Sequence, residues 1–149
     1  MRYYGNIHVK GDSSILGLNA NPNSQSPFSG WVTYDIVGEN VYQGAALYFD
    51  LVSNSWKMCN ALNLNTLPCR GMALEDISNG KKCPILRYGI AYIGRWNFLD
   101  SWLYISEKSI GSITHEKPNS VGSYVQCIGT SKGRRVAILD FCTAVVEVG

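Results

Sequence analysis

The sequence predicts an all-β domain, and three observations lead to this fold class. Short apolar or alternating runs closed by turn residues recur along the chain, whereas a 3.6-residue helical period extends over no useful length. Tyrosine, glycine, serine and asparagine are abundant and only 16% of the residues are charged, which favours strands and tight turns over helices. The 149 residues suffice for one domain with its own core.

The first thirty residues are expected to differ from the rest. Residues 3–11 have the pattern of a strand, but the Asn, Pro, Ser and Gly that follow are too frequent for regular structure, so residues 1–30 are interpreted as an extended arm or long loop. A β-rich domain is expected over residues 31–149. Its first strands are predicted from alternating or apolar runs at residues 31–37, 41–50, 56–59, 69–76 and 83–93.

Turn residues separate these strands. Residues 38–40 and 53–55 combine Gly, Glu, Asn and Ser, which end a strand in favour of a turn. The pair Asn79-Gly80 lies between two apolar runs, and both residues tolerate a positive φ. We therefore predict a hairpin turn at this pair.

The second half of the chain repeats the order of the first. The matched positions are Leu47-Tyr48 with Leu103-Tyr104, Gly71 with Gly129, and Ile85-Leu86 with Ile138-Leu139. The second-half strands are expected at residues 103–106, 112–115, 125–131 and 135–146. We interpret residues 41–93 and 97–149 as duplicated β-hairpin units that close on each other as a compact barrel or sandwich, with both leucines in a shared core.

Composition argues against several classes of function. The 13 basic and 11 acidic residues are scattered along the chain, so no nucleic-acid footprint is predicted. No signal peptide is recognised, no apolar run approaches the ~20 residues of a membrane span, and synthesis in a cytosol is expected. The five cysteines are odd in number and widely spaced, which favours small, buried, reduced side chains over disulfides or a zinc site.

One stretch formally matches a catalytic pattern. The segment GTSKG, residues 129–133, fits the G-x-S-x-G nucleophile elbow, but a strand pattern follows Ser131 and both histidines, His8 and His115, precede it. We therefore interpret this segment as a hairpin turn. Neither a Cys127–His115 pair nor the acids Glu75-Asp76 and Asp100 form a recognisable catalytic arrangement. The sequence predicts neither an enzyme nor a cofactor or metal site.

Surface contacts are the remaining source of function. The linker between the two units carries Trp96, Phe98 and Trp102, which are expected either to cap the seam between the units or to form a subunit contact. Two basic pairs, Lys81-Lys82 and Arg134-Arg135, flank the two predicted hairpin turns and offer contacts to an acidic partner. The candidate interface residues are Trp96, Phe98, Trp102, Tyr48, Tyr104, Arg134 and Arg135. A glycan-stacking platform built from Trp31, Trp56, Trp96, Trp102 and the nine tyrosines is the alternative.

The ordered motifs of residues 41–149 resemble a family of tailed-bacteriophage virion proteins. The stretches that carry the resemblance are RGMALEDISNGKKCPILRYGIA, LYIS, GSITHEKPNSVGSYVQCIGTS and the final VEV. The family comprises capsid decoration (cement) and head-fibre proteins and related C-terminal modules of tail fibres. The resemblance implies a non-enzymatic homotrimer on the virion capsid surface, whose partner is the major capsid protein lattice. The alternative implied role is host recognition through a glycan-binding fibre module.

Overall fold

The computed structural model describes residues 18–99 and 102–149, which fold as an all-β structure, as predicted. The expected strand at residues 3–11 lies outside the described residues. Within them, the only helical element is one 3-10 turn, η1 (Leu64–Thr66). The strands are β1 (Phe28–Ile36), β2 (Ala46–Asp50), β3 (Ser55–Met58), β4 (Gly71–Ala73), β5 (Lys82–Tyr92), β6 (Trp102–Ile105), β7 (Ile113–Thr114), β8 (Tyr124–Val125), β9 (Cys127–Ser131), β10 (Val136–Leu139) and β11 (Val146–Glu147).

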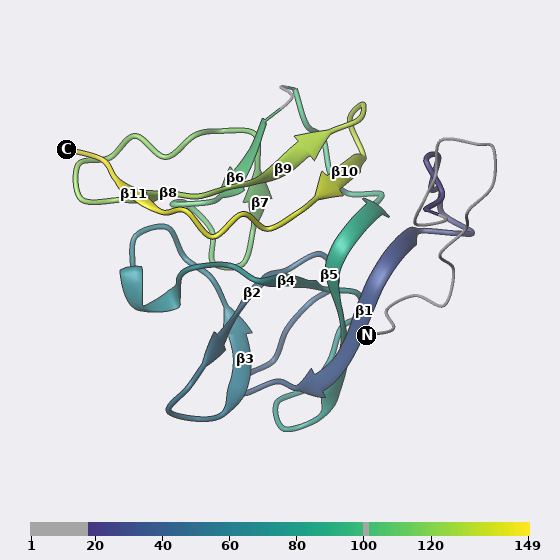
Figure 1. Ribbon diagram of the computed structural model, residues 1–149, viewed down its shortest axis with the longest axis horizontal. Coiled ribbons are helices and arrows are strands. Elements are labelled where there is room, and N and C mark those ends of the chain that lie inside the picture. The colour runs from purple at the N-terminus through teal and green to yellow at the C-terminus, as the bar shows by residue number, and fades with distance from the viewer. Residues whose placement is uncertain (1–17, 100–101) are drawn as a thin grey trace.

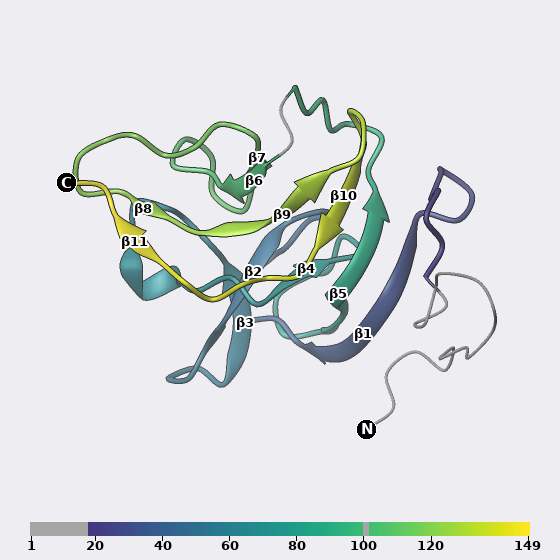
Figure 2. The same cartoon turned by 45° about the horizontal axis from the view of Figure 1, so that its top comes forward.

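Nine of these strands form one curled sheet. Its order is β3-β2-β4-β5-β10-β9-β6-β7, and β1 pairs with β5 beside that path. Strands β1, β5, β10 and β9 follow one another across one side of the molecule, and β2, β3 and β4 turn away beneath them (Figures 1 and 2). The sheet is thus a curled half-barrel, and β8 and β11 form a separate two-stranded ribbon.

Backbone hydrogen bonds from turns and loops tie the two ends of the curl together. The N–H of Ala46 donates to the carbonyl of Gly111 (2.8 Å), and the N–H of Gly111 donates to the carbonyl of Cys59 (2.8 Å). The N–H of Ala61 donates to the carbonyl of Ser106 (3.1 Å). These bonds satisfy backbone groups that an open sheet would leave to water. Of the expected barrel or sandwich, the structure thus has a half-barrel, whose two ends are joined by loops.

The predicted sequence units occupy corresponding strands on either side of the β5–β10 pair. Leu47 lies opposite Gly71 in the β2–β4 ladder, and Leu103 lies opposite Gly129 in the β6–β9 ladder. The third sequence match is shifted by one residue in the structure. Leu86 lies opposite the residue after Gly71, and Ile138 lies opposite the residue after Gly129, so Leu86 and Ile138 correspond. The sequence had instead matched Ile138 with the residue before Leu86. These two corresponding residues face opposite ways relative to the core, because Leu86 is buried whereas Ile138 is 41% exposed.

The buried side chains form two clusters instead of one shared core. The main cluster fills the curl and includes Leu86, Leu103, Ile128 and Leu139, whereas the second cluster includes Leu47, Trp56 and Ile85. The two matched leucines therefore pack in different clusters, contrary to the expectation of a shared core. A β-bulge where β1 meets β5 accompanies this difference, because it reverses which side of β5 faces the curl.

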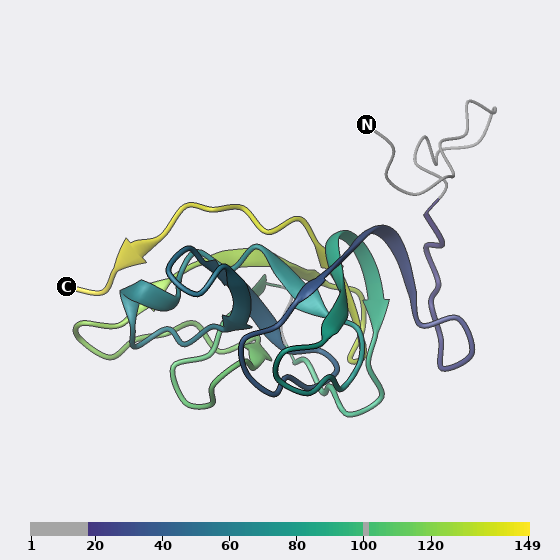
Figure 3. The ribbon, with the colours of Figure 1, turned by 90° about the horizontal axis from the view of Figure 1, so that it is seen from below.

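The long strand expected at residues 135–146 is broken. Strand β10 ends at Leu139, and Phe141 adopts a left-handed backbone conformation with a φ of 49° that interrupts the strand. The chain then runs as an extended segment to β11, which pairs with β8. Figure 3 shows this segment in yellow on the side opposite the loops around β6 and β7.

Candidate functional site

Two of the aromatic residues expected at an interface lie inside the protein. Trp96 and Phe98 both belong to the main cluster, and their ring centroids are 4.9 Å apart. Their exposed fractions are only 7% and 5%. This cluster contains residues from both halves of the sheet, so these side chains pack at the seam and are not available for an outer contact.

Trp102 differs from them because 55% of its surface is exposed. It pairs with Thr130 on β9, Thr130 pairs with Ile138 on β10, and Ile138 pairs with Ile90 on β5. Directly opposed residues of antiparallel strands project from the same side of a sheet. These side chains therefore form a row across four strands on the face directed away from the main cluster.

Tyr88 extends this row along β5, two residues before Ile90 and on the same side of the strand. Its exposed fraction is 40% and that of Ile138 is 41%. We call Tyr88, Ile90, Trp102, Thr130 and Ile138 the outer face, in which Ile90 is buried with an exposed fraction of 8%. Apolar side chains held in register on a rigid sheet are typical of a surface that another molecule covers.

A groove of about 390 Å³ runs along the outer face. Tyr88, Trp102 and Ile138 are among its lining residues, and Asp140 adds a carboxylate. Cys142 also lines this groove and is exposed, so it departs from the prediction that the cysteines are buried. The groove is thus lined by apolar side chains and one acid.

The other candidate interface residues do not form one surface patch. Tyr48 and Tyr104 are half-buried, and Tyr48 packs against the main cluster. Arg134 and Arg135 are exposed in the β9–β10 turn, where an Nη of Arg134 donates to the side chain of Asn97 (3.1 Å).

The two basic pairs lie far apart. Lys82 begins β5, whereas Val136, the residue after Arg135, pairs with Tyr92 at the other end of β5. At roughly 3.3 Å per residue, these two positions are about 30 Å apart. A single basic surface made of both pairs is therefore not formed.

The formal catalytic pattern is a hairpin, as predicted. Ser131 ends β9 and pairs with Ala137 on β10, and the chain turns between them. The acids Glu75 and Asp76 are exposed, and Asp76 accepts a hydrogen bond from the N–H of Gln43 (2.8 Å). Asp100 and His8 lie outside the described residues.

Burial controls the ionisation of the inner cysteines. Desolvation raises the pKa of the Cys59 thiol well above its ordinary value, and the neighbouring Cys69 contributes to the same shift. Desolvation also raises the pKa of Cys83 to about 11. Both side chains are therefore protonated thiols at neutral pH, whereas a nucleophilic cysteine requires the thiolate.

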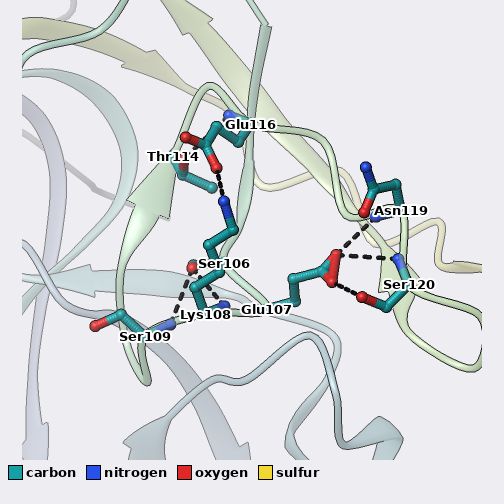
Figure 4. A network of polar contacts seen from close by, with 8 residues as sticks. All are labelled: Ser106, Glu107, Lys108, Ser109, Thr114, Glu116, Asn119 and Ser120. Atoms are coloured by element: carbon teal, nitrogen blue, oxygen red, sulfur yellow. Dashed lines mark hydrogen bonds and ion pairs between the residues drawn. The ribbon is translucent and has the colours of Figure 1, made fainter.

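A polar network holds the loops beyond β6 (Figure 4). The carboxylate of Glu107 accepts hydrogen bonds from the N–H of Asn119 (2.6 Å) and from the hydroxyl and N–H of Ser120. Nearby, Lys108 forms an ion pair with Glu116 (2.5 Å). Each acid in this network already has hydrogen-bonding partners that fix its position, so we interpret the network as structural.

Replacing Glu107 with glutamine is expected to loosen the loop around Asn119. The hydrogen bonds from Ser120 and Asn119 hold the pKa of Glu107 below its ordinary value of 4.5, so the carboxylate form is the one that the folded loop binds. Its stabilising effect is present above pH 4.5 and is lost as the pH falls through the lowered pKa. Amide exchange at Asn119 and Ser120 should therefore be faster in Glu107→Gln at pH 7. The difference from the parent protein should shrink in acid, and equal exchange at pH 7 would contradict this role.

The outer face contains residues that the sequence interpretation missed. Tyr88 and Ile138 were treated as parts of strands, whereas the structure exposes both beside Trp102. The available signal was the run from Cys83 to Ile93, which is apolar at both odd and even positions. Such a strand has a second apolar face that must be covered by the protein itself or by another molecule.

Metal-binding groups, membrane-spanning helices and related proteins were each sought, and none assigns a function. Among residues 18–99 and 102–149, no group of three His, Cys, Asp or Glu side chains is placed to hold a metal ion. In the same part of the chain, no helix combines the length and apolar character needed to cross a bilayer. No family model, curated protein or solved structure matches this chain.

Proposed function

We propose that this protein is a virion structural subunit that decorates the outside of a tailed-phage capsid and bridges its shell subunits as a homotrimer. The outer face is the observation that carries the proposal, because Trp102, Ile138 and Tyr88 present apolar surface on a rigid sheet. The resemblance of residues 41–149 to capsid decoration and head-fibre proteins supports the choice of partner. In this proposal the major capsid protein lattice or a sister subunit covers the outer face.

The proposed mechanism is selective binding. A subunit that binds the assembled lattice and not the free shell protein shifts the equilibrium toward the intact shell. Three linked copies multiply weak contacts, because the second and third contacts form at a high effective concentration. An all-β subunit with rigid strands loses little conformational entropy when it docks.

Particles assembled without this protein are expected to release their genome at a lower temperature than complete particles. The measurement is the fluorescence of a DNA-binding dye during heating, with the purified protein added back as the control. Equal release temperatures would contradict the stabilising role. Light scattering of the isolated protein should give three times the 16.5 kDa chain mass, and a stable monomer at micromolar concentration would contradict the trimer.

Glycan binding is the second candidate, because the groove on the outer face combines aromatic walls with a polar group. Trp102 and Tyr88 could stack against a sugar ring, and Asp140 could accept a hydrogen bond from a sugar hydroxyl. Trp96, an expected stacking residue, is buried and does not contribute. A glycan-array signal that Trp102→Ala abolishes would favour this function over capsid decoration.

A further inference from the structure

Arg87 lies between two tryptophan side chains. The central carbon of its guanidinium group is 5.3 Å from the ring centroid of Trp31 on β1 and 4.8 Å from that of Trp56 on β3. Each contact is within the range of a cation–π interaction. Three strands thus bring their side chains together around one cation.

The bulge in β5 creates this arrangement. Trp31 pairs with Tyr88 and Val32 pairs with Leu86, so Arg87 has no opposite residue on β1. Leu86 and Ala91 both belong to the main cluster although their positions differ by five, an odd number that regular alternation would not allow. Arg87 and Tyr88 therefore emerge on the same side of the sheet, and Arg87 adjoins the outer face.

Hydrogen bonds hold the side chains of Arg87 and Trp56 in place. The Nε–H of Arg87 donates to the carbonyl of Arg70 (3.0 Å), which sets the orientation of the guanidinium plane. The indole N–H of Trp56 donates to the carboxylate of Asp35 (3.0 Å), which holds that ring. The two rings and the carbonyl of Arg70 engage the guanidinium carbon and the Nε atom, so the Nη groups are the part of Arg87 that we assign to another ligand.

No salt bridge neutralises the charge of Arg87 within the described part of the chain. Among the described residues, the ion pairs join Lys57 to Asp50 and Lys108 to Glu116, so neither involves Arg87. Desolvation lowers the pKa of Arg87, and the positive charge of Arg70 lowers it further, whereas Asp35 raises it. An anion bound at the Nη edge would offset both the desolvation and the repulsion from Arg70.

We propose that Arg87 forms a carboxylate site that receives an aspartate or glutamate side chain of a protein partner. The planar fork of a guanidinium group matches a carboxylate with two parallel hydrogen bonds. Arginine, tryptophan and tyrosine are also the residue types that dominate binding energy at protein interfaces. The identity of the partner rests on the proposed capsid function, whereas the site itself does not.

A protein carboxylate fits this site better than a sugar. Trp31 and Trp56 both direct ring surface at Arg87, and Trp56 is almost completely buried. A sugar would need an open ring face for stacking, and the guanidinium group occupies the face that each ring directs at the site. A carboxylate needs only the Nη edge.

The test is a titration of the isolated protein with sodium propionate, which carries the reactive end of a glutamate side chain, at an ionic strength held constant with sodium chloride. We expect saturable changes in the NMR signals of the Arg87 Nε–H and the indole N–H of Trp31 and Trp56. Arg87→Gln should abolish the binding, and Arg87→Lys should weaken it about tenfold, because lysine keeps the charge but loses the bidentate fork.

Arg95 offers a matched control. Its guanidinium group lies 5.2 Å from the ring of Tyr42 and donates to the carbonyl of Gln43, so it also combines an aromatic contact with a backbone bond. Arg95→Gln should leave propionate binding unchanged. A signal change that is not saturable, or that is the same in Arg87→Gln, would overturn the site. If Arg87→Gln does not fold, Arg87→Lys decides the question, and unchanged binding in this variant would overturn the site.

Two further measurements test the identity of the partner separately from the existence of the site. Glucuronate that binds more tightly than propionate would overturn the protein-carboxylate assignment in favour of an acidic sugar. Capsids that bind Arg87→Gln as well as the parent protein would overturn the assignment of the partner carboxylate to the shell. Propionate binding by a protein that fails to bind capsids would support the site while contradicting the proposed capsid function.

Discussion

Replacing Gln126 with leucine is expected to lower the free energy of unfolding by about 3–6 kcal/mol. The Gln126 side chain is fully buried, and its Oε1 accepts a hydrogen bond from the N–H of Cys69 (2.7 Å). Its Nε2 donates to the carbonyls of Cys69 and Cys142, each at 2.9 Å. Leucine fills a similar volume but leaves three backbone groups without these partners, and each such group costs about 1–3 kcal/mol when buried.

The measurement for Gln126→Leu is urea denaturation followed by tryptophan fluorescence, because four tryptophans report on the fold. Gln43→Leu is the control, since this side chain is exposed and its loss should change the stability by less than about 0.5 kcal/mol. Amide exchange at Cys69 should also become faster, because Gln126 holds the segment before β4 against the C-terminal segment. Equal stability of Gln126→Leu and the parent protein would show that the three bonds contribute nothing.

The double replacement Trp102→Ala and Ile138→Asp is expected to weaken capsid binding by at least about 100-fold. Removing an aromatic anchor at the centre of an interface typically costs 2 kcal/mol or more, and a buried, unpaired carboxylate adds a further penalty. About half of each residue's surface is exposed in the isolated chain, at 55% for Trp102 and 41% for Ile138, so the free energy of unfolding should change less than for a core residue. Co-sedimentation of the protein with capsids measures the loss.

Leu51→Asp provides a matched control for this replacement. Leu51 is 85% exposed in the turn between β2 and β3, away from the outer face, so the same introduction of an acid should leave capsid binding unchanged. Equal binding by the double variant and the parent protein would contradict the role of the outer face. Equal losses in the double variant and Leu51→Asp would show that added negative charge, and not the outer face, controls binding.

The strands could be predicted more reliably than their surroundings. The runs at residues 31–37, 56–59 and 83–93 correspond closely to β1, β3 and β5, because alternation and turn residues are local properties of the chain. The predicted turn at Asn79-Gly80 is also present, since Gly80 has a φ of 86° and the N–H of Lys81 donates to the carbonyl of Ser78. The strand expected at residues 135–146 fails at Phe141, where long-range packing overrides the local pattern.

The candidate site was predicted only in part. Trp102 was selected from the sequence, but Trp96 and Phe98 in the same linker are buried. All three are aromatic residues in one short segment, and nothing in their identity shows which of them faces the core. Their exposure depends on where strands from the other half of the sheet pass, which is information that a local pattern does not contain.

The sequence by itself determined that the protein is built from short strands, that it turns at Asn79-Gly80 and Lys132-Gly133, and that GTSKG continues into a hairpin. The tertiary structure alone decided that the matched residues Leu47 and Leu103 pack in different clusters and that Arg87 stands between two tryptophans. The physical reason is that alternation makes neighbouring side chains of a strand point to opposite faces, whereas the curl of the sheet and the bulge in β5 set which face is covered.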